Sequence, residues 1–254
     1  MAEKLAIIKV SGRILENPEE VKVFVKSLTA IKGRKIIIFS TADAGKKMGK
    51  KMGTTVRFSG DRPVMDEATL NLYAMVYGGM VSSQFVTLLQ SYKINAAGFT
   101  GADMNFVTST LQAGDTGLTG VVHAINTQAF SELVEQGVVP VIAPFSHDGK
   151  GQMLFNETDA MASEIAKSLA IRYDVTLMYC FQRKGVLLNV DDPDSVIPVL
   201  KRTQYKNMRE MEIIKDWFAN KLDNAFSAVD HGVKEVVISS AAGLGKASEG
   251  THIK

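Results

Sequence analysis

Leu5-Ala-Ile-Ile-Lys-Val10, followed by Ser11-Gly12, is the stretch that decides the fold. It is apolar and rich in β-branched residues, and polar residues do not alternate with them, which is typical of a strand buried on both faces of a parallel sheet. Asn17-Pro-Glu-Glu20 then marks the start of a helix, because Asn caps it, Pro fits its first turn and the two acids face the positive end of its dipole. A buried strand followed by a helix predicts an α/β protein.

The same alternation continues along the chain. We expect further strands at residues 35–39, 96–100, 120–126, 138–144, 152–155, 175–180 and 235–239. We expect helices at residues 44–52, 66–92 with an interruption at Gly78-Gly79, 127–136 capped by Thr127, 159–170, 208–216 and 221–231. Residues 54–58 fit an edge strand or a hairpin arm. Strands connected through helices predict an open, mainly parallel sheet with helices on both faces.

The composition limits the class of protein. The chain has 254 residues, 46% of them hydrophobic and 22% charged, which suffices for one large α/β domain or two packed lobes. With 21 Gly, 6 Pro and 1 Cys it is neither collagen-like, nor disordered, nor stapled by disulfides. The single Cys180, the lack of a signal-like start and the lack of an apolar run near ~18 residues predict a cytoplasmic protein with no membrane partner.

The motifs of several common enzyme classes are missing from the sequence. It contains no P-loop, no Gly-x-Ser-x-Gly nucleophile elbow and no His-Glu-x-x-His helix. The four histidines lack the spacing of metal ligands, so no metal site is predicted.

Three charged residues stand out instead. Lys9 interrupts the first buried strand, and Asp159 and Lys221 lie where two helices are expected to begin. Each alone has an ordinary explanation: a strand-end lysine reaches solvent, an aspartate caps a helix and a helix lysine lies on the surface. Together they supply two cations and an organising carboxylate, which suits phosphoryl transfer, because that reaction needs positioning and neutralisation of phosphate charge.

Longer runs of the sequence resemble the amino acid kinase family, and within it the acetylglutamate kinases of the Bacteroidetes type. The resemblance extends nearly from end to end. It is carried by Ile7-Ile-Lys-Val-Ser-Gly12, Asp66-Glu-Ala-Thr-Leu-Asn-Leu-Tyr-Ala-Met-Val-Tyr-Gly-Gly79, Ala97-Gly-Phe-Thr-Gly-Ala-Asp-Met-Asn105, Asp159-Ala-Met-Ala-Ser-Glu-Ile-Ala166, Asp174-Val-Thr-Leu-Met-Tyr-Cys-Phe-Gln-Arg-Lys-Gly-Val186 and Lys221-Leu-Asp-Asn-Ala225.

The resemblance implies a three-layer α/β/α sandwich and an ATP-dependent kinase. The acceptor implied is the side-chain carboxylate of N-acetyl-L-glutamate or N-succinyl-L-glutamate, in arginine biosynthesis. Residues 1–155 would form the acyl-amino-acid lobe and residues 156–254 the nucleotide lobe of a homodimeric enzyme. By motif, Lys9 and Lys221 bind ATP and neutralise its γ-phosphate, Asp159 orients both lysines, and Gly12 lets the backbone approach the phosphates. Mg²⁺ would be held mainly by the nucleotide.

The acceptor motifs differ from those of the family. Phe39-Ser-Thr-Ala42 replaces His-Gly-Gly-Gly, Pro63 fills the slot of an arginine with Arg62 one position earlier, and Phe155-Asn-Glu-Thr-Asp159 replaces Asn-x-Asn-Ala-Asp. The acceptor contacts are therefore assigned to Ser40, Thr41, Arg62 and Asn156. The same differences keep a second hypothesis open, in which a catalytically impaired family member acts as a nucleotide-binding or regulatory protein.

Two further patterns have alternative interpretations. Eight basic residues lie between Lys32 and Arg57, and either a solvated face or a nucleic-acid patch fits them; no aromatic residue interleaves with the helix lysines, so we predict no nucleic-acid partner. Tyr73, Val76 and Tyr77 share one helical face, which fits either the core or the interface of the homodimer that the resemblance implies.

Overall fold

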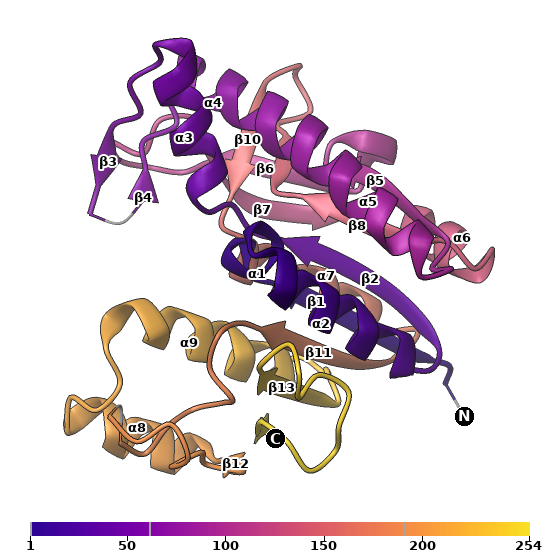
Figure 1. Cartoon of the computed structure of the whole chain (residues 1–254), viewed down its shortest axis with the longest axis vertical. Coiled ribbons are helices and arrows are strands. Elements are labelled where there is room, and N and C mark those ends of the chain that lie inside the picture. Colours follow the sequence, from indigo (N-terminus) through magenta and orange to yellow (C-terminus); the bar gives the residue numbers. More distant parts are fainter. Residues whose placement is uncertain (1, 61, 190) are drawn as a thin grey trace.

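An eight-stranded sheet, in the order β12-β14-β13-β11-β1-β2-β8-β5, forms the framework of the protein (Figure 1). The structure is a computed structural model that describes residues 2–60, 62–189 and 191–254, with only the backbone of residues 216 and 217. Neighbouring strands run parallel except for the antiparallel pair β13 and β14. The strands are β1 Lys4–Val10, β2 Arg34–Phe39, β5 Ala96–Thr100, β8 Val139–Ala143, β11 Asp174–Cys180, β12 Val199–Leu200, β13 Glu235–Ser239 and β14 Thr251–Ile253.

Helices cover both faces of this sheet. Strand β1 shows why: Leu5 and Ile7 point into one hydrophobic cluster, and Ile8 and Val10 into a second on the opposite face. The first cluster includes α6 Thr127–Glu135, α7 Thr158–Leu169, α8 Arg202–Glu210 and α9 Asp216–Asp230. The second includes α1 Gly12–Glu16, α2 Pro18–Ala30, α4 Glu67–Tyr73 and α5 Ser82–Ser91. The predicted three-layer α/β/α sandwich around a mainly parallel sheet is confirmed.

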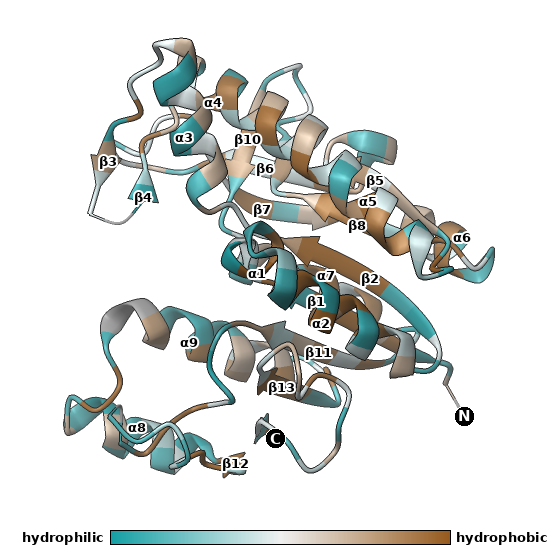
Figure 2. Cartoon of the chain, in the orientation of Figure 1, coloured by the Kyte–Doolittle hydropathy of each residue, from teal (hydrophilic) through white to brown (hydrophobic). Residues whose placement is uncertain are grey.

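Smaller elements build the upper part of the molecule in Figure 1. Four strands close into a second small sheet: β6 Val107–Leu111, β7 Thr119–Ile125, β9 Phe145–His147 and β10 Met153–Asn156. Beside it lie α3 Asp43–Met52 and the hairpin of β3 Phe58–Ser59 and β4 Arg62–Pro63. A short helix, η2, spans Asp103–Asn105. Figure 2 shows β1 and β2 mostly brown, whereas α3, which carries four lysines, is largely teal.

The long helix of this half differs from its prediction. Helix runs without a break from Glu67 to Ser91, through Gly78-Gly79, because the middle segment η1 Ala74–Val81 is a π-helix. Wider π turns accommodate an extra residue within a continuous helix, so the glycine pair does not end it. The shared face of Tyr73, Val76 and Tyr77 belongs to the core, with at most 3% of each residue exposed.

The opposite side of the same helix is exposed, and its large apolar side chains lie in the π-helical segment. Met75 and Met80 are 55% and 36% exposed. By length and composition the helix could also cross a membrane, although Phe85, Leu89 and the three residues of the core face lie in the hydrophobic core. Large apolar side chains exposed together on one turn of a helix are typical of a surface that meets a partner.

Three helix starts also differ from the predictions, and five strands were not expected. Asn126 caps α6 in place of Thr127, because its side chain accepts a hydrogen bond from the Ala129 N–H. Helix α8 spans Arg202–Glu210, six residues before the predicted start. Helix α9 begins at Asp216, so Lys221 lies in its second turn. The missed strands β4, β6, β9, β12 and β14 have two to five residues each, too few for a clear hydrophobic period.

The cap of α2 gives a direct test of how the sequence specifies this fold. The Asn17 side chain accepts hydrogen bonds from the Glu19 and Glu20 N–H groups, at 3.0 and 3.2 Å. Asn17→Ala removes both, so we expect the free energy of unfolding to fall by about 1 kcal/mol. Asn207→Ala, at an exposed position inside α8, should leave the urea midpoint unchanged or slightly higher. Equal urea midpoints for Asn17→Ala and the unmodified chain would contradict the assignment of Asn17 as the cap of α2.

Candidate active site

Two lysines and an aspartate from distant parts of the chain meet at one point. The Lys9 ammonium lies 2.9 Å from Oδ1 of Asp159, and the Lys221 ammonium lies 2.6 Å from Oδ2 of the same carboxylate. The side chains of both lysines are 9% exposed and that of Asp159 is 16% exposed. The structure therefore brings together all three residues that the sequence assigned to phosphate chemistry.

The sheet and two helices position this triad. Lys9 lies on β1 and faces the same side as Leu5 and Ile7, toward α7, because alternate residues of a strand share a face. Asp159 is in the first turn of α7, which Glu157 caps. Lys221 comes from α9, which packs against α7. Opposite charges buried at such distances neutralise one another, which offsets much of the cost of desolvating them.

Burial and charge set the protonation states of the triad. Burial alone raises the pKa of Asp159, but attraction to Lys221 and Lys9 outweighs it and holds the pKa well below its ordinary value. Burial also lowers the pKa of Lys221 to about 8; Asp159 opposes that shift and the charge of Lys9 adds to it. Asp159 is thus a carboxylate at neutral pH, whereas Lys221 loses its proton as the pH rises through about 8.

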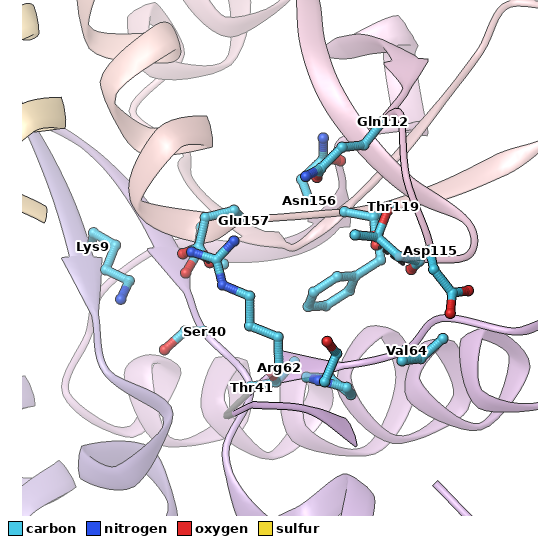
Figure 3. Close-up of a pocket in the computed structure, with 15 residues that line it drawn as sticks. Lys9, Ser40, Thr41, Arg62, Val64, Gln112, Asp115, Thr119, Asn156 and Glu157 are labelled. Carbon is cyan, nitrogen blue, oxygen red and sulfur yellow. Dashed lines mark hydrogen bonds and ion pairs between the residues drawn. The ribbon is translucent and has the colours of Figure 1, made fainter. Parts of the chain in front are cut away.

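A cavity of about 300 Å³ extends from Lys9 toward the hairpin β3–β4 and the loop between β6 and β7. Figure 3 shows Lys9 and Ser40 at one end, Arg62 and Glu157 in the middle, and the β6–β7 loop at the other end. Polar groups from β1, the hairpin, the β6–β7 loop and the start of α7 thus surround a space large enough for a small molecule. Lys9 is where this cavity reaches the triad.

The four residues assigned to the acceptor all line this cavity. They are Ser40, Thr41, Arg62 and Asn156. The Arg62 guanidinium lies 3.9 Å from the Glu157 carboxylate, and both side chains are partly exposed. Asn156 is fully buried, and its amide donates to the Ser109 hydroxyl at 2.9 Å and to the Gly120 carbonyl at 3.1 Å. Arg62 therefore reaches a ligand only by leaving a weak, partly exposed ion pair, whereas the Asn156 amide donors already hold β10 against β6 and β7.

Gly12 has a role in packing. Its contact with ATP stays a prediction. Its N–H donates to the Ser40 hydroxyl at 2.9 Å. A Cβ atom at Gly12 would lie 2.4 Å from the Ser40 carbonyl oxygen, so only glycine lets the loops after β1 and β2 meet.

Sequence reasoning missed several residues that line the cavity. Glu157 lies opposite Arg62, and the β6–β7 loop contributes Gln112, Asp115, Thr116 and Thr119. The available signal was the polar run of that loop with Gly114 and Gly117, both of which have positive φ. Such a pattern marks a turn, although it does not indicate which cavity the turn borders.

At the level of sequence, the comparisons with known proteins all point to one family. Residues 4–240 match the model of the amino acid kinase family. The chain is 41% identical to the acetylglutamate kinase of Phocaeicola vulgatus over 257 residues, which covers all of both chains. It is 39% identical to the acetylglutamate kinase of Parabacteroides distasonis, with 99% of each chain covered.

Solved structures share the fold at lower identity. N-acetylglutamate synthase from Neisseria gonorrhoeae, in complex with coenzyme A and N-acetylglutamate, superposes with a TM-score of 0.81 at 19% identity, over 99% of this chain and 59% of that one. Carbamate kinase from Giardia lamblia, bound to AMP-PNP, gives a TM-score of 0.70 at 15% identity, over 99% and 98% of the two chains.

The buried triad makes a prediction about stability. Asp159→Asn leaves two buried ammonium groups without a counter-charge, so we expect the free energy of unfolding at pH 7 to fall by about 3 kcal/mol. Because the pKa of Asp159 is lowered on folding, its contribution is fully present above pH ~4 and is lost as the pH falls further. Urea unfolding across this pH range measures both effects.

Asp230→Asn is the matched control for that measurement. Asp230 forms an exposed ion pair with Arg202, and its side chain is 54% exposed. Its replacement should change the free energy of unfolding by less than about 1 kcal/mol. If the free energy of unfolding falls equally little in both variants, the triad does not stabilise the fold as proposed.

Proposed function

Because this chain belongs to the amino acid kinase family, we propose that it transfers the γ-phosphoryl group of ATP to the side-chain carboxylate of N-acetyl-L-glutamate. The step would belong to arginine biosynthesis. The observation that carries the proposal is the Lys9–Asp159–Lys221 triad at one end of a polar cavity. The two ammonium groups are held where they can neutralise phosphate oxygens, while the cavity receives the acceptor.

The roles of the residues follow from their positions. Lys9 borders the acceptor cavity and Lys221 comes from the C-terminal half, so a phosphoryl group passing between ATP and the acceptor meets both cations. Asp159 fixes the distance between them. We assign residues 1–155 to the acceptor lobe and residues 156–254 to the nucleotide lobe of a cytoplasmic enzyme.

We propose that Mg²⁺ arrives with ATP and is held mainly by its phosphates. Among the described residues, no group of three or more His, Cys, Asp and Glu side chains is placed to hold a metal ion. The alternative, a nucleotide-binding or regulatory protein without turnover, is less favoured, because the triad is intact and relatives at about 40% identity are named as kinases.

The proposed homodimer has a surface suited to it. Strand β5 is the sheet edge of the N-terminal half; it pairs with β8, and none of the described strands pairs with its other side. The exposed residues Met75, Gly79 and Met80 lie on the helix that packs over β5. An unpaired edge strand beside an exposed apolar helix face is a favourable place for a second copy.

The proposed reaction is tested by ADP release in a coupled assay with N-acetylglutamate, N-succinylglutamate and free glutamate. We expect turnover with an acyl-glutamate. Lys9→Met and Lys221→Met should each lower it by roughly two orders of magnitude or more, because contacts that strengthen in the transition state are lost. Lys234→Met removes an exposed ion pair with Asp174 and should leave turnover unchanged. Absence of acyl-glutamate-dependent ADP release in the unmodified enzyme would overturn the proposal.

The altered acceptor motifs make a prediction about affinity. Arg62 is partnered by Glu157, and Phe155 adds an apolar ring to the cavity wall, so N-acetylglutamate should bind in roughly the millimolar range. Glu157→Gln releases Arg62 and should tighten binding, whereas Arg62→Gln should weaken it. Calorimetry measures all three dissociation constants. A micromolar constant for the unmodified chain, or no effect of either substitution, contradicts this account.

The dimer is tested by analytical ultracentrifugation at micromolar concentration. We expect about twice the chain mass of 27.6 kDa. Met75→Glu combined with Met80→Glu should shift the protein toward the monomer, since charge is costly at a buried apolar contact. Met211→Glu, at a residue that is 70% exposed in the C-terminal half, serves as the control and should remain dimeric. A 27.6 kDa species for the unmodified chain would reject the homodimer.

A further inference from the structure

Two aromatic rings lie against the Lys221 ammonium. Its nitrogen is 4.8 Å from the centre of the Tyr179 ring and 5.9 Å from the centre of the Phe181 ring. Both distances are within the ~6 Å over which a cation is attracted to an aromatic face. Tyr179 is 1% exposed and Phe181 is 9% exposed, so water screens this attraction little.

Tyr179 is itself fixed to the triad. Its hydroxyl donates a hydrogen bond to the main-chain oxygen of Asp159 at 3.1 Å. Tyr179 also pairs with Lys9 in the register of β11 against β1, so the two side chains lie on the same face of the sheet. Burial raises the pKa of Tyr179 well above its ordinary value, so its hydroxyl stays a neutral donor.

A ring supports the ammonium in a way that the carboxylate does not. Lys221 uses one of its three N–H donors on Asp159. The aromatic face stabilises the charge without needing a directed hydrogen bond, so the other donors can point toward phosphate oxygens. The groups that surround Lys221 are thus Asp159, Lys9 and Glu157, which bear charge, and the neutral Tyr179 and Phe181.

We propose that Tyr179, assisted by Phe181, is a positioning residue that keeps Lys221 protonated and directs it at the transferring phosphoryl group. The catalytic part of this statement rests on the proposed kinase function. The part that concerns the charge state of Lys221 does not.

The expected direction follows from the environment of the lysine. Burial already lowers the pKa of Lys221 to about 8. Loss of the ring removes an attraction that acts only on the protonated form, so the pKa falls further. Less of the enzyme then carries a charged Lys221 at pH 7.5, and activity declines at a lower pH than in the unmodified enzyme.

The test compares Tyr179→Leu, which removes the ring, with Tyr179→Phe, which removes only the hydroxyl. Lysines are labelled biosynthetically with ¹³C, and the Lys221 Cε signal is identified by its loss in Lys221→Arg. We expect the titration midpoint of Lys221 to fall by at least about 0.5 pH unit in Tyr179→Leu and to stay within about 0.2 in Tyr179→Phe. The alkaline limb of kcat/KM for ATP, which reports the free enzyme, should move in parallel.

The outcomes separate a positioning role from a structural one. An unchanged midpoint in Tyr179→Leu, with activity lost, makes Tyr179 merely structural and overturns the proposal. Equal shifts in both variants assign the effect to the hydroxyl and overturn it as well. If Tyr179→Leu does not fold, Phe181→Leu must shift the midpoint in the same direction by a smaller amount, and no shift there overturns the proposal. The titration needs no acceptor, so it remains readable even if the unmodified chain shows no kinase turnover.

Discussion

The buried carboxylate of Asp159 is the constraint around which the rest of the site is arranged. It neutralises two ammonium groups whose side chains are also buried, at 2.9 and 2.6 Å. Without it the two cations would repel one another, and neither would be retained in a water-poor site. The strand β1, the start of α7 and the packing of α9 on α7 all serve to bring three side chains to this one point.

The sequence was most informative where one physical requirement dominates. A buried parallel strand must be apolar throughout, so β1 and β2 could be predicted within one residue at each end. The cap Asn17 and the following Pro18 marked α2 for the same reason. Lys9 was noticeable because a charge inside such a strand needs a partner. The partner itself lies 150 residues away in sequence, so the pairing became predictable only through resemblance to a family.

Structure was harder to predict from the sequence where several weak local preferences compete. The break expected at Gly78-Gly79 did not occur, because tertiary packing of Tyr73 and Tyr77 holds a π-helical segment in place of a loop. The cavity beside Lys9 was harder still. Its wall combines a two-residue hairpin strand, a polar loop and the residue Glu157, and only their arrangement in space joins them. No periodicity of the sequence encodes such an arrangement.

The central place of β1 has a consequence for how the protein is made. Its partners are β2, which follows within 40 residues of the N-terminus, and β11, which ends at Cys180. A ribosome must therefore synthesise more than two thirds of the chain before the second edge of β1 can be covered. Until then the nascent chain carries an apolar strand with one open edge, which is a site for mispairing with other chains. Chaperone capture during translation is the natural protection for such an intermediate.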